Sequence, residues 1–148
     1  MEMRVKKRTA VVVIVVVVFG LAICAAFTTK REHCQEKIQK FLVGIVNGEV
    51  DKSWDEVLSG TPIASNSQVV KLLKEEVQTA LNTYGKAVSY EFIKEQKYGD
   101  SIIRFVYIVK CKQIPLIWEF YFYKAASDWE LKTVSVNFKG QYDLLADK

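Results

Sequence analysis

Histidine is almost absent from this 148-residue chain, which has only His33. A Ser-His-Asp or Cys-His catalytic set would therefore have to use His33, which lies in the solvated polar run 30–33. A glycine-rich phosphate loop is also missing, and no cluster of His or Cys has the spacing of metal ligands. The sequence therefore predicts no catalytic residue, no metal and no cofactor.

Concentrated positive charge is missing from most of the chain. The formal net charge is +4, and residues 1–27 supply +3 of it, through four basic residues against one acidic residue. Residues 28–148 therefore carry only +1. Since a nucleic-acid-binding domain normally shows a basic patch, we expect no nucleic acid among the partners.

Charged residues are also missing from Ala10–Phe27, so residues 1–28 are expected to be either a signal peptide or a transmembrane anchor. A span needs roughly 20 apolar residues, whereas the core of a signal peptide has about 7 to 15 and precedes small residues. The valine-rich run 11–18 favours the anchor, and the small residues at 24–26 favour cleavage. The basic residues before the run place the N-terminus in the cytoplasm. We therefore expect a single-pass membrane protein with its domain outside the cytoplasm, or a secreted domain after cleavage.

A third possibility for the head concerns Cys24. The segment Leu21-Ala22-Ile23-Cys24 looks like the lipid-attachment box of bacterial lipoproteins. That box has Gly, Ala or Ser where this chain has Ile23, and the departure argues against lipidation.

Apolar residues then recur at helical spacing in three segments. They predict helices from residue 28 or 29 to 48, from 51 or 53 to 58, and from 67 to 84, with a loop over 62–67. The apolar positions of these helices are Ile38, Phe41, Leu42 and Ile45, then Trp54, Val57 and Leu58, then Val69, Val70, Leu73, Val77, Ala80, Leu81 and Tyr84.

After Gly85 the period becomes that of strands. We expect strands over 87–96, 102–111, 114–123 and 129–138, with a hairpin turn at 98–100 and a bulge near Lys132-Thr133. Helices followed by consecutive antiparallel strands predict an α+β domain over 29–140, with three helices packed on a bent four-stranded sheet. Residues 141–148 form a polar tail.

The most apolar stretch after the head is Ile114–Tyr123, expected near the middle of the sheet. Successive side chains of a strand alternate between faces, so this strand needs a cover on both faces. One cover is the helix layer over Trp118 and its neighbours. The other is a second copy of the chain, an unknown protein partner, or merely partly hydrated tyrosines. Its contact residues would be Ile117, Tyr121 and Tyr123.

Several motifs spread over Glu32–Phe138 point to one family. They are Phe41-Leu42, Asp51-x-x-Trp54, the helix Val69–Tyr84, and Trp129-x-Leu131-x-x-Val134-x-Val136. In this order they resemble the nuclear transport factor 2-like, or cystatin-like, superfamily, and in particular its small secreted or membrane-anchored bacterial members. The resemblance implies helices packed in the hollow of a strongly bent antiparallel sheet. The superfamily hosts enzymes resembling ketosteroid isomerase and many non-catalytic binding modules, so the fold does not choose between them.

A pocket between helices and sheet is the alternative to a docking surface. Its candidate lining is Trp54, Tyr90, Tyr107 and Trp118. An isomerase-like reaction there would need a carboxylate base and acidic donors. The candidate carboxylates are Glu91 and Glu119, and the candidate donors are Tyr107, Tyr121 and Tyr123. The alternation of side chains along a strand, however, turns both carboxylates away from the aromatic row, towards solvent or a cross-strand lysine.

The cysteines allow one covalent bond outside the cytoplasm. Cys34 and Cys111 could pair, which would contribute on the order of 4 kcal/mol in the chain-entropy model. Two separate thiols are the other possibility, since spacing does not give their distance. The function we expect is a non-catalytic extracytoplasmic binding or assembly module. The alternative is a small-molecule-binding or isomerase-like pocket enzyme.

Overall fold

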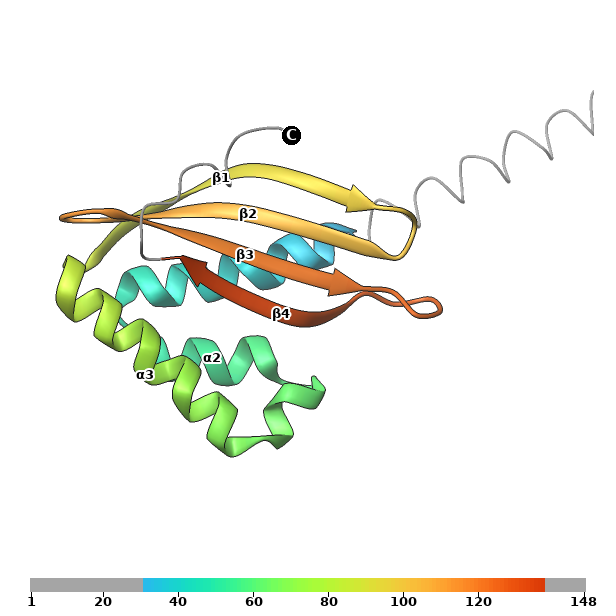
Figure 1. The fold of residues 1–148 in the computed structure, drawn as a ribbon, viewed down its shortest axis with the longest axis horizontal. Helices are drawn as coiled ribbons and strands as arrows, with labels where there is room; N and C mark the ends of the chain where they lie inside the picture. Colours follow the sequence, from blue (N-terminus) through green and yellow to red (C-terminus); the bar gives the residue numbers. More distant parts are fainter. Residues whose placement is uncertain (1–30, 138–148) are drawn as a thin grey trace, which may run out of the picture. The chain divides into compact units, whose positions relative to one another are not determined.

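The computed structural model describes residues 31–137, so the predictions for the head (1–28) and the tail (141–148) lie outside the described residues. The chain falls into two compact units, Met1–His33 and Cys34–Lys148, and the fold below is that of the second. Within the described part, helices precede an open antiparallel sheet, which confirms the predicted α+β class (Figure 1). The elements are a helix over 31–47, α2 (Val50–Leu58), the short 3₁₀ helix η1 (Pro62–Ser65), α3 (Ser67–Tyr84), β1 (Ala87–Tyr98), β2 (Ile102–Cys111), β3 (Pro115–Tyr123) and β4 (Glu130–Asn137).

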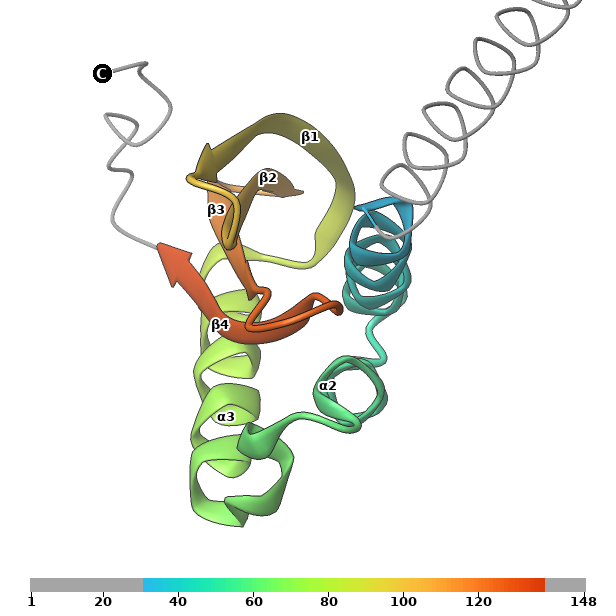
Figure 2. The same ribbon diagram turned by 90° about the vertical axis from the view of Figure 1, so that its right-hand side faces the viewer.

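The four strands lie in the sheet in chain order, each antiparallel to the next, so β2 and β3 are interior strands and β1 and β4 are edges. The helices lie on one face of this sheet, and β1 curves strongly (Figures 1 and 2). In the β3–β4 pair, Thr133 faces Tyr121 and Leu131 faces Phe122, which leaves Lys132 as the extra residue of a bulge. This confirms the bulge predicted near Lys132-Thr133. It brings the apolar residues on both sides of Lys132 onto the helix-covered face.

Helix ends and one close approach shape the helix layer. The side chain of Asn66 caps α3 by accepting a hydrogen bond from the N–H of Val69 at 3.2 Å. The helix over 31–47 crosses α2 at Gly44, where a Cβ atom would lie 2.0 Å from Oγ of Ser53. Only glycine allows the two helices to approach this closely. The segment predicted as a loop contains the 3₁₀ turn Pro62–Ser65, since proline suits the first helical position.

The core lies between the helices and the face of the sheet that they cover. Trp118 and Phe120 are fully buried there, with ring centroids 5.3 and 5.8 Å from that of Phe41. The predicted helix cover over β3 is therefore confirmed. The other buried hydrophobic residues of this core include Ile38, Leu42, Ile45, Trp54, Val57, Leu58, Val77, Leu81, Phe105, Tyr107, Val109, Leu116, Phe122 and Leu131.

Candidate functional site

The interior brings together the four residues predicted to line a pocket. The ring of Phe41 lies against both Trp54 and Trp118, with centroids 4.9 and 5.3 Å apart and edge-to-face geometry. Both indoles have no exposed surface, and Tyr107 has 1% exposed. Tyr90 is half-buried, 6.3 Å from the ring of Tyr107. Trp54, Tyr107 and Trp118 therefore form packed core rather than the wall of an open pocket, because large rings fill the space between them, and Tyr90 lines a separate surface hollow of about 600 Å³.

The opposite face of the sheet carries a buried ion pair between neighbouring strands. Nε of Arg104 on β2 donates to Oε2 of Glu119 on β3 at 2.8 Å, and both side chains are only 9% exposed. The hydroxyl of Tyr121 donates to the same oxygen at 2.8 Å. A second guanidinium nitrogen of Arg104 donates to Oε1 of Gln96 on β1 at 2.5 Å. The network therefore joins β1, β2 and β3 across the face that the helices leave uncovered.

The surroundings of Tyr121 and Arg104 favour the neutral phenol and the charged guanidinium. Burial raises the pKa of Tyr121 to about 12, and its hydrogen bond to Glu119 adds to the effect, so the phenol stays a donor. Burial alone would lower the pKa of Arg104, but the hydrogen bond and charge of Glu119 outweigh it and the pKa is raised. Glu119 is therefore the partner of a guanidinium, not the solvent-facing or lysine-paired carboxylate that we expected. Glu91 does pair with a cross-strand lysine, Lys110, at 2.7 Å.

The three predicted contact residues of this outer face differ in accessibility. Ile117 is 1% exposed, and Tyr121 is half-buried with its hydroxyl bound to Glu119. Only Tyr123 is exposed, at 41%. Ile117 lies in mid-sheet, opposite Ile108 on β2, whereas Tyr123 ends β3.

Tyr123 belongs to an exposed row that the sequence reasoning did not identify. In the sheet register Tyr98 faces Ile102, and Ile102 faces Tyr123. Tyr98 is 49% exposed and Ile102 is 38% exposed. We call these three residues the tip row. The tip row was not predicted because Tyr98 was assigned to a turn. An apolar residue at each of three adjoining strand ends is the signal that could have identified the row.

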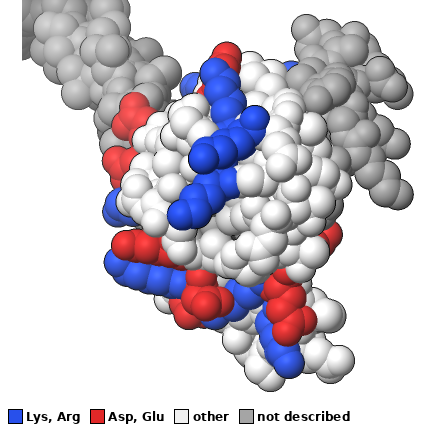
Figure 3. All heavy atoms as spheres, turned by 90° about the vertical axis from the view of Figure 1, so that its left-hand side faces the viewer, with Lys and Arg blue, Asp and Glu red and all other residues white. Residues whose placement is uncertain are grey.

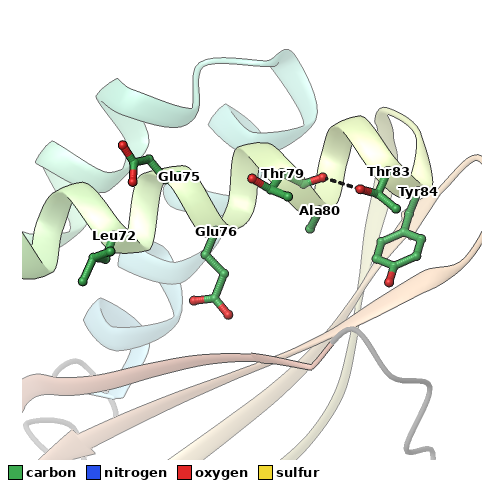
Figure 4. A pocket seen from close by; sticks show the side chains of 7 residues that line it. All are labelled: Leu72, Glu75, Glu76, Thr79, Ala80, Thr83 and Tyr84. Carbon is green, nitrogen blue, oxygen red and sulfur yellow. Dashed lines mark hydrogen bonds between the residues drawn. The ribbon is translucent and has the colours of Figure 1, made fainter.

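A second surface feature is a hollow of about 580 Å³ along α3 (Figure 4). Leu72 is 57% exposed there, and Glu76 has no ion-pair partner among the described residues. Oε1 of Glu75 lies 3.7 Å from Nζ of Lys71. The hydroxyl of Thr83 donates to the carbonyl of Thr79 at 2.9 Å. In Figure 4, Leu72 and Glu76 point from α3 towards the sheet. The lining residues are Leu72, Glu75, Glu76, Thr79, Ala80, Thr83 and Tyr84.

The edge strand β4 lies on the side of α3 to which Leu72 and Glu76 point (Figure 4). β4 pairs with β3 on one side. On its other side, residues 131–136 have no strand partner within 31–137. The N–H and C=O groups on such an edge can accept an added strand. The structure thus combines an open edge with an exposed leucine and carboxylates on the adjacent helix.

Lysines gather at the end of the sheet where α3 leads into β1, which Figure 3 shows from outside. Its exposed lysines are Lys86, Lys110 and Lys112. The N–H of Gln113 donates to the carbonyl of Tyr84 at 3.0 Å, which ties the β2–β3 turn to the end of α3. Because Glu91 neutralises Lys110, two lysines remain, too few for a phosphate-backbone footprint.

Of the two possibilities for Cys34 and Cys111, the structure shows two separate thiols. Burial raises the pKa of Cys34 to about 11, with smaller effects from Lys37, which lowers it, and Glu95, which raises it. Cys34 is thus within electrostatic reach of Glu95, which faces Phe105, six residues before Cys111 on β2. Six strand residues span roughly 20 Å, far more than the ~7 Å between Cα atoms that a disulfide allows.

Between residues 31 and 137, no group of three or more His, Cys, Asp or Glu side chains could hold a metal ion. No helix in that part of the chain has the length and apolar character needed to cross a membrane.

The resemblance stated from the motifs gains no support from known proteins and stays a prediction. No protein-family model matches the chain, and neither a curated protein nor a solved structure matches it.

Proposed function

We propose that this protein is a non-catalytic docking module that binds a protein partner along β4 and α3. The module works outside the cytoplasm, held to the membrane by the N-terminal segment or exported across it. The head sequence supports the location, through its charge-free run Ala10–Phe27 after a basic start.

The open edge of β4 beside the hollow along α3 is the observation that carries this proposal. An extended segment of a partner can add to such an edge through main-chain hydrogen bonds, while its side chains enter the hollow beside Leu72. Glu76 favours a partner segment with a basic residue, since complementary charge speeds encounter and suppresses wrong partners, whereas Glu75 already pairs with Lys71. The pocket-enzyme alternative lacks such support, because aromatic rings fill the interior.

The sheet-face homodimer stays a prediction with a reduced contact set. Tyr123 remains available, whereas Ile117 is buried and Tyr121 is engaged with Glu119. The edge of β4 offers a second copy another route, because two edge strands can pair and extend the sheet.

Site-specific photo-crosslinking in the full chain, within its native membranes, tests the docking site. A photoreactive residue replaces Leu72 on α3 or Ser135 on β4, and the matched control replaces Val88, which is 60% exposed at the start of β1. We expect the same product from Leu72 and Ser135 and none from Val88. The mass of the product separates a second copy from another protein. Equal products at all three positions, or none at the first two, would contradict the proposal.

Proline on the edge strand distinguishes strand addition from other contacts. The N–H groups of successive strand residues point alternately to the two sides, so one of Val134 and Ser135 directs its N–H to the open edge. Proline at that position removes no hydrogen bond within the sheet. We expect one of the variants Val134→Pro and Ser135→Pro to keep its circular-dichroism spectrum and to lose the product from Leu72. If Val134→Pro and Ser135→Pro both fold and both still give the product from Leu72, strand addition is excluded.

A further inference from the structure

The tip row lies at the end of the sheet where the chain enters the folded unit. Cys34, in the first turns of the helix over 31–47, is within electrostatic reach of Glu95, three residues before Tyr98. The start of that helix, blue in Figure 1, lies at the same end of the sheet as the tip of β1. The charge-free run ends at Phe27, and four residue steps from there to residue 31 span at most about 14 Å. An anchor in that run therefore keeps this end of the domain close to the membrane surface.

The two turns at this end form one continuous surface. The N–H of Lys124, after β3, donates to the carbonyl of Ser101, before β2, at 2.8 Å. Nζ of Lys124 also lies 5.2 Å from the ring centre of Trp129, which is half-buried. The tip row thus adjoins a tryptophan and a lysine, and Lys97 precedes Tyr98.

This combination of side chains suits a lipid surface better than a second copy. Tyrosine and tryptophan place an apolar ring and a polar atom at the boundary between headgroups and acyl chains, and lysine reaches the phosphate level. Three half-exposed side chains offer roughly 300 Å², at about half of what an aromatic residue can bury. A stable protein interface needs about 800 Å² from each partner. A lipid surface has no such threshold, because the anchor already holds the domain beside it.

We propose that the tip row docks on the surface of the membrane that holds the N-terminal segment. Tyr98, Ile102 and Tyr123 enter the headgroup region, and the domain stands on this end. The open edge of β4 and the hollow along α3 then face sideways, where a partner can reach them. This inference rests on the tethered form of the proposed function.

Quenching of tryptophan emission by brominated lipids tests the contact in the full chain, reconstituted into phosphatidylcholine vesicles. The parent is Trp129→Phe, in which only the buried Trp54 and Trp118 emit. Tyr123→Trp puts a reporter in the tip row, and Val88→Trp puts a matched, exposed reporter at the opposite end of the sheet. With lipids brominated near the headgroups, we expect the emission added by Tyr123→Trp to be quenched and that added by Val88→Trp to be unchanged.

A further variant separates docking from mere tethering. Tyr98→Ser with Ile102→Ser, added to Tyr123→Trp, leaves the anchor intact, and we expect quenching to be lost. Undiminished quenching in that variant, or equal quenching of both reporters, would overturn the proposal. So would a chain that floats with the vesicles but shows no quenching. If the emission of the Tyr123→Trp reporter changes with the density of protein in the vesicles and not with bromine, the tip row contacts a second copy of the chain instead.

Each proposal can fail without the other. Crosslinks from Leu72 and Ser135 do not depend on bromine quenching, so their loss would remove the partner site alone. A chain that does not float with vesicles would remove the tether and the lipid contact together.

Discussion

The two faces of β3 differ in what holds them. The helix-covered face buries Trp118 and Phe120 against Phe41, and non-directional apolar contact dominates there. The outer face holds Glu119 through directed bonds from Arg104 and Tyr121. The comparison shows that one strand can be buried on both faces by different physics. Substitutions on the two faces should therefore fail in different ways.

The largest expected effect is on the helix-covered face. Trp118→Ala removes a fully buried indole that contacts Phe41 and Phe120, and truncating such a residue costs about 3–5 kcal/mol. Because small domains have only about 5–15 kcal/mol in total, we expect a large fall in the urea midpoint or complete unfolding. A midpoint within error of the parent would show that the interior is not packed as described.

Breaking the ion pair from one side should cost slightly less. Glu119→Leu leaves the buried guanidinium of Arg104 without its anion, and we expect a loss of about 3 kcal/mol in urea unfolding. Arg104→Met together with Glu119→Leu removes both charges and should restore most of that loss, since apolar replacement of a buried pair is often neutral. If the double variant is as unstable as Glu119→Leu, the cost on this face is lost packing and the contrast between the faces disappears.

Alkaline pH separates the faces through their tyrosines. Burial, followed by the charges of Tyr90 and Glu95, raises the pKa of Tyr107 on the helix-covered face to about 12. The unfolded chain releases this proton near pH 10. The stability that the raised pKa of Tyr107 contributes is therefore fully present below about pH 10 and is lost as the pH rises to about 12.

The shift of Tyr107 corresponds to about 2–3 kcal/mol. Tyr107→Phe cannot ionise, so its stability should fall less steeply over this window in urea unfolding measured at successive pH values. Tyr121→Phe should flatten the profile less, because Tyr121 is half-exposed and solvent screens its charge. If Tyr121→Phe flattened the pH profile more than Tyr107→Phe, the outer face would hold the more deeply buried tyrosine, contrary to the comparison.

Periodicity predicted the arrangement along the chain well. Helical spacing predicted the bounds of α3, and alternation assigned the two faces of β3, because burial of one face imposes these periods. The bulge at Lys132 was also predictable, since the apolar residues of β4 change phase there. Local rules suffice wherever a segment's own pattern decides which side is buried.

The contacts between strands were not predictable in the same way. Alternation turned Glu119 outward, but its pairing with Arg104 depends on the register that the β2–β3 turn sets. The pocket prediction brought the right residues together, yet whether Phe41 fills the space between Trp54 and Trp118 depends on side-chain volumes that no period reports.

The smallest effect on stability is expected at the exposed end of β3. Tyr123→Ser removes a side chain that is 41% exposed and has no buried partner to leave unsatisfied, so urea unfolding should change by less than about 0.5 kcal/mol. The same strand would then lose several kcal/mol at Trp118 and almost nothing five residues later. A loss at Tyr123 comparable to that at Trp118 would mean that the tip row supports the fold. Near-zero loss means that an aromatic side chain remains partly in water without stabilising the domain, which is expected of a residue that makes its contacts outside the chain.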